Sequence, residues 1–170
     1  MNNIIYLLGL PGSGKSTLGK EIAERLGYGF VDVDHEIELQ EGKLIKAIFS
    51  EEGETYFREV ESTVLQSLLP ESNTIIATGG GAPCFFDNMD FMMAHGTTIF
   101  LDISVKELMY RMEASDGQED RPLLTGKGKK ELEKELALKR EQRGEFYEQA
   151  DISIQDDNIN AEIIIQLINS

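Results

Sequence analysis

Short runs of apolar residues recur along the chain and are separated by longer stretches of mixed character. Five runs of four or five residues are rich in β-branched and aromatic side chains and contain few charges. Such runs are typical of strands that are buried on both faces of a sheet. The predicted strands are 4-IIYLL-8, 29-GFVDV-33, 74-TIIAT-78, 98-TIFLD-102 and 151-DISI-154.

Between the predicted strands, apolar residues repeat with the period of an α-helix. Gly27 ends the first of these stretches and Pro70 ends the second, as both residue types commonly do after a helix. Strand and helix alternate throughout, which predicts an α/β fold with a mainly parallel sheet covered by helices on both faces. The predicted helices span residues 15–26, 52–69, 105–113, 129–149 and 161–169.

Residues 114–130 break the alternation. This segment, ASDGQEDRPLLTGKGKK, contains three glycines, a proline and charges of both signs, with little periodicity. Long loops without secondary structure in a compact domain are usually functional or disordered. Because 121-RPLL-124 lies within it, we expect a mobile loop that takes part in function rather than a plain surface excursion.

Composition and charge narrow the class of protein. A chain of 170 residues, 41% of them hydrophobic, is long enough for one domain with one core. The net charge of −15 disfavours binding to nucleic acids and anionic membranes. No apolar run approaches the roughly 20 residues that cross a bilayer, and the single cysteine, Cys84, cannot form an internal disulfide. We therefore expect a soluble, cytoplasmic protein.

The segment 9-GLPGSGKST-17 follows the first predicted strand and opens the first predicted helix. This context identifies GxxxxGK(S/T) as a phosphate-binding loop rather than a chance turn. Lys15 is expected to reach the β- and γ-phosphates, Ser16 to ligate Mg²⁺, and Thr17 to approach the α-phosphate. Backbone N–H groups can point inward at the glycines, and the helix N-terminus attracts phosphate. These glycines are Gly9, Gly12 and Gly14.

Two polar pairs are candidates for the side of the site that receives the phosphate. Asp32 and Asp34 end the second predicted strand, where period-2 alternation puts both carboxylates on one side, able to face the phosphate loop. A helix cap or a solvated strand end is the plainer interpretation of this pair. Arg58 and Glu61 lie three residues apart on a predicted helix, which also fits an ordinary ion pair.

A triple glycine in 78-TGGGAP-83 follows the third predicted strand. Ligands bind at the carboxyl ends of parallel strands, which favours close approach of this backbone to a ligand over a loose turn. Arg121, in the loop, and Arg143, in a late helix, add two cations. Each arginine is weak evidence alone, because exposed arginines are common.

Taken together, these stretches resemble the shikimate kinase family over essentially the whole chain. The motifs are GLPGSGKST, the DVD pair, FREVE, TGGGAP, DRPLL and RGEFY, in the family's order and approximate spacing. The resemblance implies transfer of the ATP γ-phosphoryl group to the 3-hydroxyl of shikimate, on the way to chorismate and aromatic amino acids. It also implies a three-layer P-loop kinase fold with a five-stranded parallel sheet of order 2-3-1-4-5. One domain over 1–170 would include a substrate-binding region at about 33–61 and a mobile lid at about 112–128.

The resemblance also implies roles on the acceptor side. Asp34 would accept hydrogen bonds from substrate hydroxyls, including the nucleophilic one, and act as base. Arg58 and Arg143 would hold the shikimate carboxylate, a task that suits planar guanidinium groups. Glu61 would orient Arg58. Backbone at the triple glycine would hold another hydroxyl, and its residues are Gly79, Gly80 and Gly81.

On the nucleotide side, the resemblance implies ATP and Mg²⁺ as cofactors. Asp32 would hold the Mg²⁺ shell together with Ser16. Arg121 on the lid would close over the phosphates and act in catalysis with Lys15. The adenine contacts align less well with the family, and Arg111, Asn158 and Asn160 are the candidates. The loop residues that bind phosphate would be Gly12, Ser13, Gly14, Lys15, Ser16 and Thr17.

Two alternatives remain open at this stage. Another P-loop kinase of small molecules, such as a gluconate or nucleoside monophosphate kinase, would use the same loop with a different acceptor. A nucleotide-binding regulator would keep the fold without catalysis. We expect a monomer whose partner is a small-molecule substrate.

Overall fold

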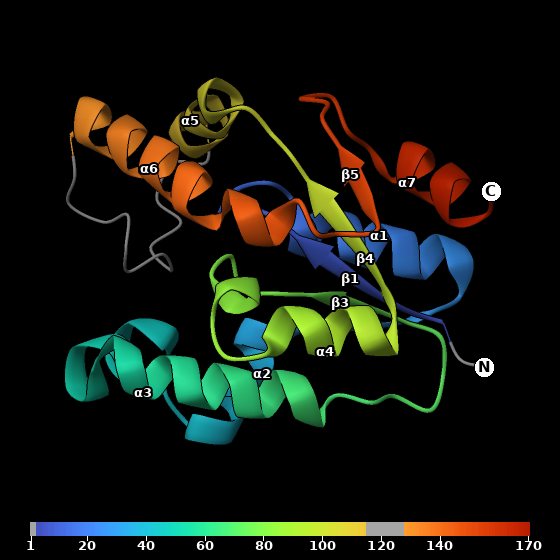
Figure 1. Cartoon of the computed structure of the whole chain (residues 1–170), viewed down its shortest axis with the longest axis horizontal. Helices are drawn as coiled ribbons and strands as arrows, with labels where there is room; N and C mark the ends of the chain where they lie inside the picture. The colour runs from blue at the N-terminus through green and yellow to red at the C-terminus, as the bar shows by residue number, and fades with distance from the viewer. Residues whose placement is uncertain (1–2, 115–127) are drawn as a thin grey trace.

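A computed structural model describes residues 3–114 and 128–170. Its centre is one parallel sheet of five strands in the order β2-β3-β1-β4-β5, which confirms the predicted topology (Figure 1). Each strand differs from its predicted range by at most one residue at either end. The strands are β1 (Ile4–Leu8), β2 (Gly29–Asp32), β3 (Thr74–Ala77), β4 (Thr97–Leu101) and β5 (Ile152–Ile154).

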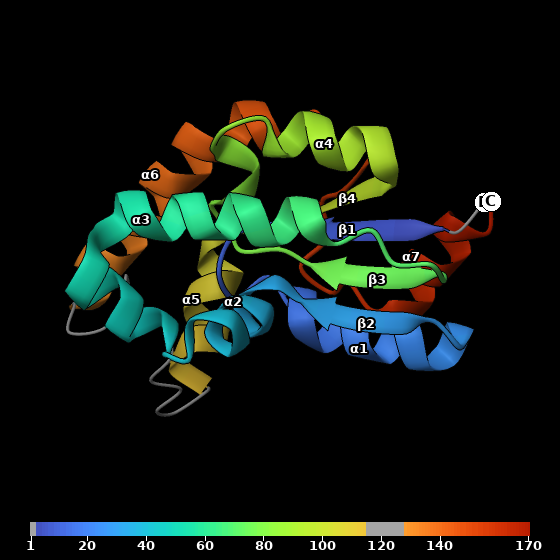
Figure 2. The same ribbon diagram turned by 90° about the horizontal axis from the view of Figure 1, so that it is seen from below.

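Helices cover both faces of the sheet, as the alternation of elements predicts. Helices α1 and α7 lie together on one face, and α3 and α4 lie on the other (Figure 2). Helices α5 and α6 contact each other beyond the carboxyl ends of the strands (Figure 1). The helices are α1 (Lys15–Leu26), α2 (Val33–Glu41), α3 (Ile45–Ser67), α4 (Asn88–His95), α5 (Val105–Ala114), α6 (Lys129–Tyr147) and α7 (Ala161–Ile168), with a short 3₁₀ helix, η1 (Ala82–Cys84).

Several helices differ from the prediction. Helix α3 begins at Ile45 instead of residue 52, because a break at Gly53 (φ 86°) joins two helical segments that have no common periodicity. Helices α2 and α4 and the 3₁₀ helix were not predicted. Helix α2 is short and mostly charged, and the apolar residues of α4 do not form one stripe, so neither has a clear helical pattern. No helix in the described ranges is long and apolar enough to cross a membrane.

The central strand β1 is buried along its whole length. It lies between β3 and β4, with Ile5 opposite both Ile75 and Thr97. Helices on both faces leave no polar side for this strand, which explains its continuous apolar sequence. The loops that follow β1, β2 and β3 therefore start from fixed points on one edge of a rigid sheet.

The hydroxyl of Tyr6 in β1 is an exception within this core. The side chain is fully buried, and its oxygen has no hydrogen-bond partner among the described residues. Burial raises the pKa of the phenol to about 12, so it remains neutral. We predict that Tyr6→Phe raises the free energy of unfolding by about 1 kcal/mol, because an unsatisfied buried hydroxyl is removed. Urea unfolding measures this change, and a loss of stability would contradict the prediction.

Candidate active site

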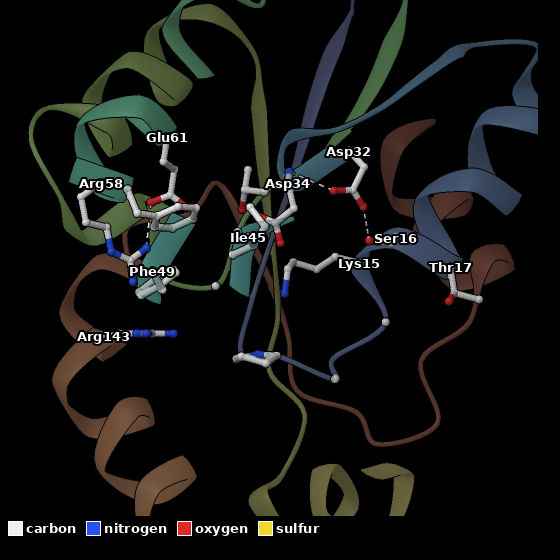
Figure 3. A pocket seen from close by; sticks show the side chains of 18 residues that line it. Lys15, Ser16, Thr17, Asp32, Asp34, Ile45, Phe49, Arg58, Glu61 and Arg143 are labelled. Carbon is white, nitrogen blue, oxygen red and sulfur yellow. Dashed lines mark hydrogen bonds and ion pairs between the residues drawn. The ribbon is translucent and has the colours of Figure 1, made fainter. Parts of the chain in front are cut away.

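A pocket of about 280 Å³ opens at the edge of the sheet where β1, β2 and β3 end. In Figure 3, Arg58, Glu61 and Arg143 lie at one end of it, Ser16 and Thr17 at the other, and Lys15 and Asp34 between them. The structure thus brings together nearly all the residues predicted for the phosphate loop and the acceptor side. Those lining the pocket are Gly12, Gly14, Lys15, Ser16, Thr17, Asp32, Asp34, Arg58, Glu61, Gly79, Gly80, Gly81 and Arg143.

The phosphate loop connects β1 to α1. Gly9 adopts a φ of 148°, and a Cβ there would lie 2.9 Å from the carbonyl oxygen of Leu101, so only glycine fits. The Lys15 Nζ lies 2.8 Å from the carbonyl oxygen of Gly9, inside the loop. Ser13 is the one predicted loop residue whose side chain is buried away from the pocket. The loop therefore offers backbone and one cation to a phosphate chain.

The prediction that Asp32 and Asp34 both lie on a strand was wrong. Strand β2 ends at Asp32, which caps α2 by accepting hydrogen bonds from the backbone N–H of Asp34 at 3.0 Å and His35 at 3.3 Å. The first turn of α2, rather than strand alternation, brings the Asp34 carboxylate to the pocket. The other oxygen of Asp32 accepts a hydrogen bond from the Ser16 hydroxyl. This pair offers the hard oxygen ligands that Mg²⁺ prefers.

Asp34 lies in the middle of the pocket, open to the cavity but surrounded by protein atoms. This desolvation raises the pKa of its carboxyl group to about 6, and the negative charge of Asp32 adds to the effect. The positive charges of Lys15 and Arg58 oppose it. A carboxylate with a raised pKa is a better proton acceptor than an ordinary aspartate.

Arg58 and Glu61 form the predicted ion pair, but it is buried. Their side chains are 6% and 1% exposed, and the Arg58 Nη1 lies 2.8 Å from the Glu61 Oε1. The ring of Phe85 lies 4.3 Å from the guanidinium carbon and holds the group from one side. Burial raises the pKa of Glu61 to about 7 despite the opposing charge of Arg58. Glu54 also contacts Arg58, at 3.3 Å, from a more exposed position.

Charged side chains crowd the triple glycine after β3 and leave no room for a Cβ atom. A Cβ at Gly79 would lie 2.5 Å from the Glu61 Oε2, one at Gly80 would lie 3.1 Å from the Arg143 Nη1, and one at Gly81 would lie 2.6 Å from the Arg58 Nη2. No side chain fits in any of these positions without moving a charged group of the pocket. The backbone of this segment therefore lies directly against the charged groups of the pocket.

Arg143 reaches the pocket from α6, at the end opposite Ser16 and Thr17 (Figure 3). Its Nη1 is buried and has no hydrogen-bond partner within the part of the chain that the structure describes. A buried guanidinium N–H without an acceptor is costly. This arginine is therefore suited to hold an anionic group of a ligand.

The adenine candidates lie outside the lining of this pocket. Arg111 donates to the Asp157 carbonyl oxygen at 2.8 Å and to the Ser13 carbonyl oxygen at 3.4 Å, so it links the phosphate loop to the segment before α7. Asn160 caps α7 by accepting a hydrogen bond from the N–H of Ile163. Asn158 is exposed. Arg121 and nearly all of the predicted lid fall outside the described residues.

Sequence reasoning missed an apolar wall of the pocket, formed by Ile45, Phe49 and Phe57 of α3. The rings of Phe49 and Phe57 lie 4.5 Å apart. These residues are on opposite sides of the break at Gly53, so no single helical stripe connects them. The i,i+4 spacing of Ile45 and Phe49 could have indicated one apolar helical face before Gly53. The packing of Phe57 against that face could not be predicted from spacing.

The chain is similar to known proteins over most of its length. The model of the shikimate kinase family matches residues 11–170. A shikimate kinase of Parabacteroides distasonis is 44% identical over 88% of this chain and 85% of its own length. Another, of Persephonella marina, is 47% identical over 88% of this chain and 87% of its own.

Solved structures agree with the sequence matches. Shikimate kinase of Bacteroides thetaiotaomicron superposes with a TM-score of 0.91 at 36% identity, over 99% of each chain. That of Acinetobacter baumannii, solved in complex with shikimate, gives 0.87 at 35% identity over 99% of this chain and 94% of its own. A gluconokinase of Sinorhizobium meliloti shares the fold alone, at 18% identity and a TM-score of 0.56. The chain therefore belongs to the shikimate kinase family.

Proposed function

We propose that the pocket transfers the γ-phosphoryl group of ATP to the 3-hydroxyl of shikimate, giving shikimate 3-phosphate and ADP. The observation that carries this proposal is one cavity with a phosphate loop at one end, two arginines at the other and a carboxylate between them. The family places the reaction in the pathway to aromatic amino acids. Shikimate is bound in the structure of the relative from Acinetobacter baumannii.

At the acceptor end, Arg143 and Arg58 would bind the shikimate carboxylate. The Nη1 of Arg143 supports this role, because it has no acceptor among residues 3–114 and 128–170 and an anionic ligand would supply one. Glu61 would hold Arg58 in place through their buried ion pair. The backbone of Gly79 to Gly81 would contact the hydroxyl groups, and the apolar wall would cover the carbon ring.

At the donor end, the N–H groups of the loop at Gly12 and Gly14 and the start of α1 would bind the phosphate oxygens. The Ser13 N–H, also predicted to bind phosphate, donates to the Leu10 carbonyl oxygen at 3.1 Å. Lys15 would turn from the loop carbonyls toward the β- and γ-phosphates, and Thr17 would contact the α-phosphate. The enzyme uses ATP with Mg²⁺, which Ser16 and Asp32 would hold and which neutralises charge on the phosphates. Arg111 is our candidate beside adenine, with Asn158 and Asn160 nearby.

For the transfer itself, Asp34 would accept the proton of the 3-hydroxyl. The hydroxyl oxygen then forms its bond to the γ-phosphorus, and the bond from that phosphorus to the leaving oxygen of ADP breaks. Lys15 would balance negative charge on the transferred group, and positioning supplies most of the rate. Arg121 would add positive charge from the lid at about 112–128 and exclude water.

We further propose that residues 1–170 act as one catalytic domain, with the substrate-binding region at about 33–61. We expect a monomer in the cytoplasm. The pocket contains groups from four helices and the strand ends, so residues of one chain form both the donor end and the acceptor end.

The proposal is tested by ADP release with a panel of acceptors. Purified protein, ATP and Mg²⁺ are mixed with shikimate, gluconate or a nucleoside monophosphate, and ADP is followed by a coupled assay. Shikimate should raise ADP production far above the rate without acceptor. If gluconate or a nucleotide did so and shikimate did not, the acceptor assignment would be wrong. Nucleotide binding without turnover for any acceptor would instead indicate a regulator.

A further inference from the structure

Tyr147 is the last residue of α6 and lies in the protein interior. Its side chain is fully buried, and its ring stacks on Phe100 of β4 with centroids 4.8 Å apart. The hydroxyl donates a hydrogen bond to the carbonyl oxygen of Gly80 at 2.5 Å. Burial raises the pKa of this phenol to about 12 against the opposing effect of Arg143 beside it, so the phenol keeps its proton and remains a donor.

With this bond, each carbonyl group of the triple glycine accepts a hydrogen bond. The Gly79 carbonyl accepts from the N–H of Ala82 at 3.1 Å, and the Gly81 carbonyl accepts from the N–H of Cys84 at 3.0 Å. Both of these bonds are local turns of the chain. The Gly80 carbonyl has no such local donor, and its partner comes from 67 residues away.

The orientation of the carbonyl groups decides where the N–H groups point. In a planar trans peptide, the carbonyl of one residue and the N–H of the next point in opposite directions. Tyr147 does not line the pocket, whereas Gly81 does. The bond from Tyr147 fixes the direction of the Gly80 carbonyl and, with it, the opposite direction of the N–H of Gly81. Within the described ranges, the N–H groups of the three glycines have no hydrogen-bond acceptor.

Tyr147 also lies one helical turn after Arg143, on the same side of α6. The Nη1 of Arg143 is near Gly80, since a Cβ at Gly80 would lie 3.1 Å from it. Gly80 thus has Arg143 against its Cα and Tyr147 on its carbonyl, both from one rigid helix. A shift of this peptide would move a backbone donor relative to the guanidinium group beside it.

We propose that Tyr147 is a positioning residue for the acceptor: its hydroxyl fixes the peptide between Gly80 and Gly81, so that the glycine N–H groups and Arg143 bind shikimate together. This inference rests on the proposed function, because it assigns the acceptor that these groups hold. Tyr147 itself does not contact the phosphate loop, whereas Gly80 does, because a Cβ at Gly80 would lie 3.1 Å from the Pro11 Cδ. Loss of the Tyr147 hydroxyl should therefore affect acceptor binding more than nucleotide binding.

The test is Tyr147→Phe, with Tyr6→Phe as the matched control. Each variant removes one hydroxyl from a fully buried tyrosine, but only the Tyr147 hydroxyl contacts the glycine segment. We expect Tyr147→Phe to raise the KM for shikimate about three- to tenfold, the range set by one net hydrogen bond. The KM for ATP should change less than about twofold, and Tyr6→Phe should change neither constant.

A second variant separates the hydroxyl from the packing of the ring. Phe100→Leu weakens the stacking under Tyr147 but keeps the hydroxyl. It should lower the melting temperature while raising the KM for shikimate less than Tyr147→Phe does. An unchanged KM in Tyr147→Phe, or an equal rise in Phe100→Leu, would overturn the inference. Failure of the proposed function would look different, because the unmodified protein would then show no shikimate-dependent ADP release.

Discussion

Replacing Asp34 with asparagine should lower kcat with shikimate by about three orders of magnitude, the size of effect expected when a general base is removed. The variant keeps the shape of the side chain and loses the charge that accepts the proton. Asp34 lies between the two ends of the pocket, and its pKa is raised to about 6 by desolvation and by Asp32. The backbone N–H of residue 34 still donates to Asp32, so the cap of α2 survives.

The affinity of the variant for ATP shows whether the loss of kcat comes from the missing base or from general damage to the site. Titration of the Asp34→Asn variant with ATP and Mg²⁺ should give a dissociation constant within about twofold of the unmodified value, since α2 keeps its position. Glu36→Gln, which removes a carboxylate from the same helix outside the pocket, is the matched control and should keep full turnover. Equal losses of ATP binding and turnover in Asp34→Asn would place Asp34 on the nucleotide side.

Arg143→Ala should raise the KM for shikimate about a hundredfold, because a charge-assisted contact in a desolvated site is lost. The guanidinium group is buried at its Nη1 and lies at the opposite end of the pocket from Ser16 and Thr17. Steady-state kinetics with shikimate varied at saturating ATP measures the change. The KM for ATP, from the converse experiment, should stay nearly constant.

Two further variants show whether the geometry or the charge of Arg143 is responsible for shikimate binding. Arg143→Lys keeps the charge but loses the planar pair of donors, so it should recover only part of the affinity. Lys134→Ala removes a positive charge from an exposed position on the same helix and should have no effect. An unchanged KM for shikimate in Arg143→Ala would remove this residue from the acceptor site.

Local patterns in the sequence were sufficient to predict the sheet. Each strand is a short apolar run, because helices cover both faces of the sheet. The alternation of strands and helices along the chain predicts that the strands are parallel. The phosphate loop could also be predicted from the sequence, because its glycines and Lys15 are close together in the chain and form one local motif. The family resemblance added the strand order and the identity of the acceptor.

The parts that could not be predicted depend on contacts between distant segments. Asp34 reaches the pocket from the first turn of α2, so its location was predicted correctly but its secondary structure was not. The break at Gly53 joins two segments of α3 into one apolar wall, which no single periodicity describes. The bond from Tyr147 to Gly80 joins residues 67 positions apart. Long-range partners of this kind leave no local signal.

The most direct test of the central claim is the position of the phosphate on the product. The protein is incubated with ATP, Mg²⁺ and shikimate, and the product is analysed by phosphorus–proton correlation NMR. We expect the new phosphorus signal to correlate with the proton on C3 of shikimate and ADP to form in equal amount. Phosphate on another hydroxyl, or ADP formed with only inorganic phosphate while shikimate stays unmodified, would contradict it.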